Sequence, residues 1–321
     1  MDIFNLTLRQ MLMMFFLILC GFILRKKKIL PENAHIALSR IETYIFVPAL
    51  TIFNLMTQCT VKTFAENYHL ILYGTVICLL GILLSYPLSR IFVPASNSSK
   101  ELVYQRNVYK YAMAFGNYGF MGNFIILGVW GNEFFYKYTL FTFGISILCY
   151  AWGLYILIPK EQNASFTENL KKGLLTPPII GIVIGMAVGL LNLKSYIPDF
   201  VLTALDNAGA CQGPVAMILA GFVIGGYNFK ELLTNKKVYF ASLFRLVFIP
   251  ALLMVGLSLI NASEELMILA LIAFATPLGL NTIVFPAAYG GETKTGASMA
   301  MISHTLAVVT IPLMYLVFIA L

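Results

Sequence analysis

The sequence predicts an all-α integral membrane protein, with ten transmembrane helices arranged as two inverted repeats of five. Three observations support this fold class: an apolar composition, ten separate apolar segments, and two interruptions at matching positions in the two halves. Of the 321 residues, 60% are hydrophobic and only 11% are charged, whereas soluble domains carry about 25% charged residues. This composition excludes a soluble enzyme, a secreted disulfide scaffold and a nucleic-acid-binding domain.

Ten apolar segments have lengths close to the roughly 20 residues that cross a bilayer core of about 30 Å. They are continuous apolar runs, which are typical of transmembrane helices and not of the alternating strands of a membrane barrel. The loops between them are too short for a catalytic domain, so we expect no enzymatic activity. The expected spans are 7–24, 36–57, 68–92, 107–130, 136–158, 175–192, 198–226, 238–259, 265–289 and 297–320.

The Lys and Arg residues indicate the orientation of the chain, because basic residues concentrate in cytoplasmic loops. The odd-numbered loops and the adjoining span ends hold 17 of the 21 basic residues, whereas the opposite side holds Arg9, Lys62, Lys137 and Lys194. We therefore expect a multi-pass protein of the cell membrane, plasma or inner, with both termini outside.

Five spans in each half mean that the second half starts from the opposite side of the membrane, as in many secondary transporters. The expected organisation is a first repeat over 1–160, a short cytoplasmic linker over 161–174, and an inverted second repeat over 175–321. A shift of 159 positions supports the repeat, because it aligns Gly131 with Gly290 and Glu133 with Glu292. Pro48 and Pro214 also correspond, each lying in the second span of its half.

The fourth and ninth spans are interrupted near the bilayer centre by residues that disfavour a helix. The fourth contains the Gly- and Asn-rich segment 116–123, and the ninth contains Pro277 and Gly279 within the segment 276–282. In a helix interior Gly costs about 1 kcal/mol and Pro about 3 kcal/mol relative to Ala. Because unpaired backbone groups cannot face lipid, we expect helices 4 and 9 to be broken and to cross inside the protein.

The two breaks together predict a binding site for a small organic anion, most simply a carboxylate. Each break exposes free N–H groups and the positive end of a helix dipole, both of which attract anions. The alternative is that the glycines only allow close helix packing and the prolines only kink the helices. The predicted substrate-binding residues are Asn117, Gly119, Gly122, Asn123, Thr276, Pro277, Asn281 and Thr282.

Three ionisable residues within the spans are candidates for coupling or proton transfer. Asp206 is either a buried proton or cation site or a residue facing an aqueous vestibule, and His304 is either a proton shuttle or a neutral packing residue. Arg245 either snorkels to the headgroups, which we favour, or binds the substrate carboxylate. Arg40 and Glu42 begin the second span, and we expect both to be interfacial.

Neither a metal site nor a cofactor is predicted. The five cysteines show no metal-ligand spacing and are typical of small apolar packing residues. No histidine pair, acidic cluster or nucleotide-binding motif occurs in the sequence. The expected partners are therefore a small organic anion and the lipid bilayer, with no nucleic acid.

The two interruptions resemble those of the auxin efflux carrier family, in its bacterial form, which is related to the bile acid/sodium symporter-like superfamily. The stretch from Asn117 to Gly122 is similar to the family's Asn-x-Gly-Phe-x-Gly crossover. Thr276-Pro277 to Asn281, then Phe285 and Tyr289-Gly290-Gly291, resemble its second crossover. The segments 177–189 and 214–221 resemble its sixth and seventh spans, so the resemblance covers essentially the whole chain.

This resemblance implies a scaffold of helices one, two, six and seven, and a transport unit of the other helices that moves against it, an elevator mechanism. It also implies that Asn117 and Asn281 contact the substrate anion and that the scaffold forms a homodimer. The chain departs from the family pattern at Phe124, where proline is common, and at Thr176, where asparagine is common. Auxin is not the expected substrate, because the long central loop of plant auxin carriers is missing.

The function that these observations predict is secondary active transport, or uniport, of a small organic anion by alternating access. Coupling to protons or to sodium is left open. The alternatives are a sodium-coupled carrier of the bile-acid symporter type, a membrane receptor and a channel.

Overall fold

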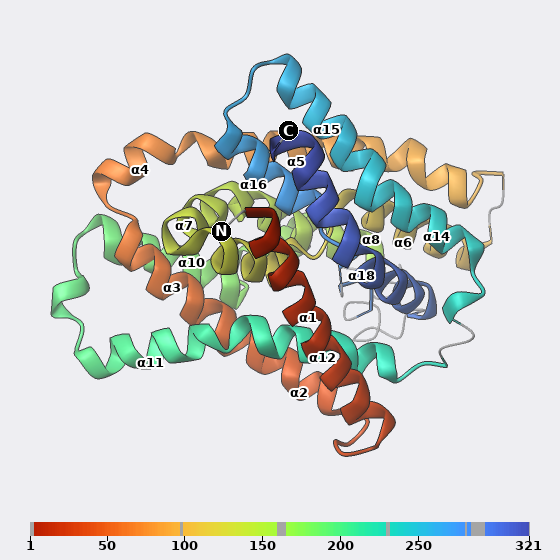
Figure 1. Cartoon of the computed structure of the whole chain (residues 1–321), viewed down its shortest axis with the longest axis horizontal. Helices are drawn as coiled ribbons and strands as arrows, with labels where there is room; N and C mark the ends of the chain where they lie inside the picture. Colours follow the sequence, from red (N-terminus) through yellow and green to blue (C-terminus); the bar gives the residue numbers. More distant parts are fainter. Residues whose placement is uncertain are drawn as a thin grey trace.

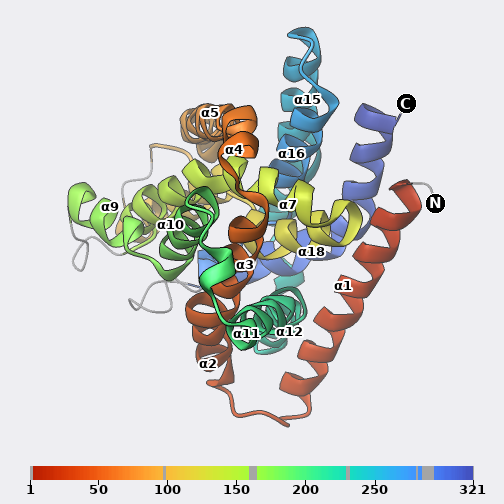
Figure 2. The same cartoon turned by 90° about the vertical axis from the view of Figure 1, so that its left-hand side faces the viewer.

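The computed structural model describes residues 3–96, 99–158, 165–228, 232–279, 281–283 and 293–320. In these residues all regular structure is helical, apart from one isolated antiparallel bridge between Gly116 and Leu278. Figures 1 and 2 show long helices that cross at varied angles, with the two ends of the chain near each other in both views. The predicted all-α fold class is therefore confirmed at this level.

The first half of the chain contains two long helices without π-helical joints, which cover residues 3–26 and 69–92, and several helices joined by π-helical segments. One π-helical segment covers residues 42–46, and another covers residues 118–122, where helix resumes after an interruption. The elements are α1 (Ile3–Lys26), α2 (Ala34–Ile41), η1 (Glu42–Phe46), α3 (Val47–Gln58), α4 (Val61–Asn67), α5 (His69–Phe92), α6 (Lys100–Ala114), η2 (Tyr118–Gly122), α7 (Asn123–Leu148), η3 (Cys149–Gly153) and α8 (Leu154–Leu157).

The second half also contains π-helical segments and a short helix that ends at an interruption. Its elements are α9 (Phe166–Leu174), α10 (Pro177–Leu190), η5 (Lys194–Tyr196), α11 (Asp199–Ala210), α12 (Gln212–Gly225), α14 (Lys236–Leu243), η6 (Phe244–Phe248), α15 (Ile249–Leu259), α16 (Glu264–Ala275), α18 (Lys294–Tyr315) and η7 (Leu316–Ala320).

Seven described helices are long and apolar enough to cross a membrane, or eight if the bent pair Thr167–Leu174 and Pro177–Leu190 forms one span. This number is lower than the predicted ten, so ten spans and an inverted repeat stay predictions. Part of the difference comes from α6 and α16, which have only 15 and 12 residues because each ends at an interruption. In addition, Tyr118–Leu157 forms one unit of 40 residues, bent at Gly131 with φ 77°.

Two predicted segments lie partly outside the described residues. Of the predicted linker 161–174, residues 161–164 are not described, and Phe166–Leu174 forms the helix α9. The end of the second crossover motif, with Phe285 and Tyr289-Gly290-Gly291, also lies outside, as does Glu292 of the repeat comparison.

The helices α6 and α16, which lead into the two breaks, begin in the same way. Ser99 precedes α6, and its hydroxyl accepts a hydrogen bond from the Leu102 N–H at 3.3 Å. Ser263 precedes α16 and caps it through the Leu266 N–H, also at 3.3 Å. Serine is a preferred N-cap because its side chain satisfies an N–H group that has no partner within the helix. The sequence therefore defines the starts of both short helices locally.

Glycines bring one group of helices into backbone contact. A Cβ atom at Gly21 of α1 would lie 2.0 Å from the Ile218 carbonyl oxygen of α12, and one at Gly221 would lie 1.8 Å from that of Ile18. Gly189 of α10 packs in the same way on Cys59, just beyond α3. Such small residues allow close helix approach where no hydrophobic effect drives association. We call α1, α2–α3, α10 and α11–α12 the scaffold group.

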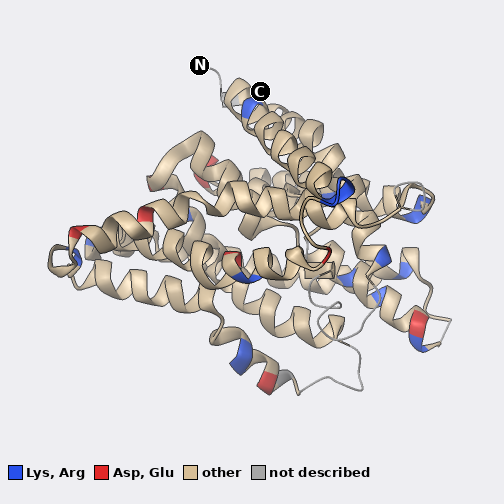
Figure 3. Cartoon of the chain, turned by 90° about the horizontal axis from the view of Figure 1, so that it is seen from below, with Lys and Arg blue, Asp and Glu red and all other residues tan. Residues whose placement is uncertain are grey.

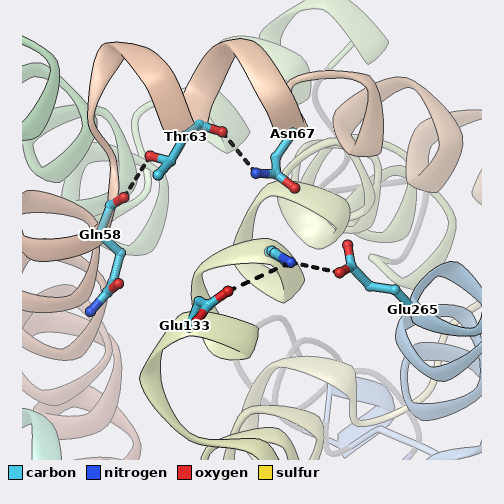
Figure 4. A network of polar contacts seen from close by, with 6 residues as sticks. Gln58, Thr63, Asn67, Glu133 and Glu265 are labelled. Atoms are coloured by element: carbon cyan, nitrogen blue, oxygen red, sulfur yellow. Dashed lines mark hydrogen bonds and ion pairs between the residues drawn. The ribbon is translucent and has the colours of Figure 1, made fainter.

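The remaining long helices, α5–α7 and α14–α18, form a second group around the two breaks, which we call the crossover group. Charged residues stand mainly near helix ends and in loops (Figure 3). Lys137 is an exception, because it lies within α7. Its amino group contacts the carboxylate of Glu265 in α16 at 2.6 Å and that of Glu133 at 3.8 Å (Figure 4). This ion pair connects a helix of the first half to one of the second.

Candidate functional site

The two interruptions meet inside the protein. After α6 the chain becomes extended at Phe115 (φ −121°, ψ 135°), and after α16 it becomes extended at Thr276 (φ −66°, ψ 149°). The extended pieces pair side by side, and the Asn117 N–H donates a hydrogen bond to the Pro277 carbonyl at 2.7 Å. Helix resumes at Tyr118 in the first crossover and at residue 281 in the second. Each break therefore satisfies backbone groups of the other, as broken backbone in a membrane requires.

A cavity of about 80 Å³ lies against this crossing. Its walls come from both groups of helices, with Thr43, Thr51 and Ile182 from the scaffold group and both crossovers from the crossover group. The other lining residues are Val47, Gly116, Asn117, Tyr118, Gly119, Phe120, Asn123, Thr139, Thr142, Ser146, Tyr150, Pro178, Gly279 and Asn281. Amides, hydroxyls and backbone thus dominate its polar surface, and none of these described lining residues is charged.

The side chain of Asn117 is held by a residue of the other half. Its amide nitrogen lies 3.3 Å from Nε2 of His304 in α18, and Nδ1 of His304 lies 2.7 Å from the Ala300 carbonyl oxygen. Because a carbonyl only accepts hydrogen bonds, we assign the proton of the neutral ring to Nδ1, and Nε2 accepts from Asn117. His304 is 2% exposed, so its geometry fits a neutral residue that positions Asn117.

The side chain of Asn281 is held in the opposite direction, by the first half of the chain. Its amide nitrogen donates to the Tyr111 hydroxyl of α6 at 3.0 Å and approaches the Cys149 sulfur at 3.4 Å. Tyr111 and Cys149 are themselves 3.0 Å apart. A tyrosine hydroxyl and a thiol thus orient the second crossover amide.

Arg245 lies behind the crossing and not at the membrane surface. Its Nη1 donates to the carbonyls of Met113 and Ala114 at 3.2 and 3.5 Å, and its side chain is completely buried. The prediction that it snorkels to the headgroups is therefore wrong, because the guanidinium turns inward to the last carbonyls of α6. The C-terminal end of a helix dipole is negative, so this cation stabilises the broken end of α6. Arg245 does not line the cavity.

Of the eight predicted substrate-binding residues, the structure places Asn117, Gly119, Asn123 and Asn281 in the cavity wall. The other four take part in the backbone of the crossing. Pro277 accepts the hydrogen bond from Asn117, and a Cβ atom at Gly122 would lie 2.1 Å from the Tyr138 hydroxyl. Thr276 and Thr282 are fully buried and donate to carbonyls one turn earlier, those of Ala273 and Gly279.

The polar face of α7, which forms part of the cavity wall, was not predicted from the sequence. Thr139, Thr142 and Ser146 follow one another at spacings of three and four residues, so they share one face of the helix. A search for periodic hydroxyl residues within the apolar spans would have found them. Thr43 and Thr51 form a similar, more widely spaced pair in the second span.

Two acidic residues differ in their surroundings. Asp206 is exposed and lines a separate cavity of about 220 Å³ with Asn54 and Asn132, so both interpretations of this residue stay open. Glu42, which was expected to be interfacial, is instead completely buried. The expectation for Glu42 is wrong because its helix turns this side chain toward α12, while Arg40 stays exposed.

The cavity can bind a small acceptor-rich molecule through hydrogen-bond donors and the starts of helices. In the described residues no group of three His, Cys, Asp or Glu side chains could hold a metal ion. Among the lining residues that the structure describes, none forms the nucleophile–base pair that a hydrolytic site needs. Its chemistry is recognition by amides, hydroxyls and backbone N–H groups.

The comparisons with known proteins agree with this description. Residues 6–315 match the family model described as membrane transport protein. The chain is also 24% identical over 306 residues to an uncharacterized transporter of Methanocaldococcus jannaschii, covering 94% of this chain and 96% of that one. An uncharacterized transporter of Methanothermobacter thermautotrophicus is 23% identical over 216 residues, covering 67% and 66%. With a family model that spans nearly its whole length, this multi-pass chain belongs to the membrane transport protein family, the auxin efflux carrier family that its crossovers resemble.

Proposed function

We propose that this transporter is a secondary carrier that moves a small organic anion, most simply a carboxylate, across the cell membrane. The observation that carries the proposal is the uncharged, partly polar cavity where two broken helices cross. An anion bound there would be neutralised by helix ends and oriented by amides, without a cation in the wall. This arrangement suits a cargo that must also leave again, because no direct ion pair has to be broken.

The start of the first resumed helix supplies the main attraction for the anion. The first turn of a helix leaves N–H groups without partners inside the helix, and its dipole is positive at that end. Tyr118, Gly119 and Phe120 form this turn, and all three line the cavity. A Cβ atom at Gly119 would have no neighbour within 4 Å, so the backbone there is open to the cavity. Carboxylate oxygens could therefore approach these N–H groups closely.

The size of the cavity favours a small substrate. A single water needs at least about 10–15 Å³ of comparable volume, so a cavity of about 80 Å³ holds only a few waters or a short carboxylate. A large amphipathic anion exceeds this volume. This argument favours the organic anion carrier over a carrier of bile-acid type.

The position of the cavity between two helix groups supports alternating access. Thr43 and Thr51 belong to the scaffold group, whereas Asn117 and Asn281 belong to the crossover group. A shift of the crossover group along the scaffold would carry the crossing, with its bound anion, from one side of the membrane to the other. We propose this elevator movement, with both termini outside and a homodimer formed through the scaffold group. The driving force would be a proton or sodium gradient, or the substrate gradient alone.

The test is uptake into proteoliposomes by the full chain, with a panel of radiolabelled probes: acetate, lactate, malonate, succinate and malate. We expect Asn117→Ala and Asn281→Ala each to weaken binding of the transported probe about 10- to 100-fold, as loss of a hydrogen bond to a charged group implies. The matched control is Asn33→Ala, because Asn33 is exposed and makes no side-chain cap bond. Unchanged affinity in both crossover variants would disprove the site assignment.

The same preparation separates the rival functions. A sodium-coupled carrier would require sodium for uptake of the probe, and omission of sodium tests this directly. A channel would pass single-channel currents in planar bilayers far above the turnover of a carrier. A receptor would bind a probe without any uptake.

A further inference from the structure

We propose that Glu42 is a proton-binding site of this carrier, neutral in the conformation described here, which releases its proton when the crossover group moves away from the scaffold. Only the release step depends on the proposed transport function. Glu42 is completely buried, and neither of its carboxyl oxygens has a hydrogen-bond partner of normal geometry among the described residues. A buried carboxylate without such partners is very costly, so the group holds a proton instead.

The surroundings of Glu42 provide no counter-charge. The elements packed against η1 are α2, α3, α10, α11 and α12. Of these, α3, α10 and α12 contain no charged residue. The charged or titratable residues of the other two are His35 and Arg40 of α2 and Asp199 and Asp206 of α11. Arg40, Asp199 and Asp206 are exposed, and His35 lines a different cavity.

The α12 backbone offers Glu42 little that would stabilise a charge. The Ala216 N–H faces the carboxyl group and favours its ionised form, but it makes no hydrogen bond of normal geometry, so the cost of burial outweighs it. One turn earlier on α12, Gln212 is 1% exposed, and its Nε2 atom is also without a partner among the described residues.

Glu42 also lies on a helix that connects two cavities. One turn before it, Ser39 and Arg40 line a cavity of about 510 Å³ that also contains Arg25 and His35. One residue after it, Thr43 lines the cavity at the crossing. The π-helical turn Glu42–Phe46 lies between the two, and such wide turns occur often at functional sites. Both cavities are therefore lined by residues within one helical turn of Glu42 along the chain.

The packing of α12 connects Glu42 to the crossing. Gln212 and Ala216 lie on the side of α12 near η1, and Gly213 beside them packs directly on the Phe124 ring. A Cβ atom at Gly213 would lie 1.9 Å from that ring. Phe124 follows the first crossover, and its carbonyl accepts a hydrogen bond from Gln10 of α1 at 2.8 Å. Movement of the crossover group would therefore disturb this segment of α12 and admit water to Glu42, which would then give its proton to that water.

The first test is infrared spectroscopy of the purified full chain in detergent near neutral pH, which needs no substrate. We expect a C=O stretching band of a neutral carboxylic acid in the wild type. The band should be absent in Glu42→Gln and retained in Glu133→Gln, a matched control whose side chain is 81% exposed. No loss of the band in Glu42→Gln would overturn the proposal, and so would a band that appears only after sodium is removed.

A second measurement covers the case in which the infrared band is weak. If the folded protein keeps a proton on Glu42 that the unfolded chain loses, wild-type stability must fall as pH rises. We expect the Tm of the wild type to fall more than that of Glu42→Gln between about pH 6 and about pH 9, for the same reason. Parallel curves would contradict the proposal.

The release step is tested by uptake of whichever carboxylate probe the wild type transports. A pH gradient should accelerate uptake by the wild type and by Glu133→Gln, but not by Glu42→Gln. An equal response in all three would overturn the coupling role even if the infrared band is present. Failure of every probe would contradict the proposed function and leave the infrared result to decide the protonation of Glu42.

Discussion

The first crossover holds its asparagine with a histidine, whereas the second holds its asparagine with a tyrosine hydroxyl and a thiol. Asn117 contacts His304, and Asn281 contacts Tyr111 and Cys149. In both cases the partner comes from the opposite half of the chain. The difference is that Asn117 is almost fully buried with one side-chain partner, whereas Asn281 is half-buried with two. Neither half can therefore complete the cavity alone, and the first crossover depends more on a single contact.

The largest expected effect comes from filling the point where the crossovers touch. A Cβ atom at Gly116 would lie 2.6 Å from both Nη2 of Arg245 and Oγ1 of Thr276. We therefore expect Gly116→Ala to destabilise the protein by about 1–3 kcal/mol, as overpacking does. A lower Tm in detergent checks this. The matched control is Gly256→Ala, because a Cβ atom at Gly256 would have no neighbour within 4 Å. Equal Tm values for the two variants would show that the crossing is not tightly packed.

The next effect separates the two asparagine supports. His304→Leu leaves the buried Asn117 amide without its side-chain partner, which costs about 1–3 kcal/mol. Tyr111→Phe removes one of two partners of Asn281 and should cost about 1 kcal/mol or less. Thermal unfolding of both variants in the same detergent measures the difference. If Tyr111→Phe lowers the Tm more than His304→Leu does, the first crossover does not depend more strongly on a single contact than the second crossover does.

The smallest effect concerns the ion pair that joins α7 and α16 outside the crossing. The side chains of Lys137 and Glu265 are 19% and 33% exposed, so we expect a coupling free energy of about 1 kcal/mol or less, reduced by salt. A double-mutant cycle of Lys137→Met and Glu265→Gln measures it at low and high ionic strength. A coupling that is large and independent of salt would mean that this pair supports the crossings as strongly as the buried contacts do.

Several properties of the site could be predicted because they depend on local chemistry. Clusters of Gly, Asn and Pro weaken a helix locally, so breaks within 116–123 and 276–282 could be predicted, and α6 and α16 end at these two segments. Serine caps likewise determine the starts of α6 and α16. Asn117 and Asn281 were predicted as site residues, and the structure places both in the cavity wall.

Other properties depended on which helix packs against which. Nothing within the segment 40–46 indicates that Glu42 turns inward while Arg40 stays exposed, because this depends on the position of α12. Thr276 and Thr282 were predicted to bind substrate and Thr139 and Thr142 were not, yet of these four only the α7 pair lines the cavity. The inward turn of Arg245 follows from the position of the α6 carbonyls, which are more than 100 positions away in the sequence.

The apolar composition, the helical class and the places where helices break thus follow from the amino-acid sequence, since each depends on the transfer energy or backbone preference of neighbouring residues. Only the folded arrangement decides which polar side chains share a cavity, which cation covers a helix end and which acid is buried without a partner. These properties arise from contacts between the two halves of the chain, and the rotation of each helix about its axis sets them.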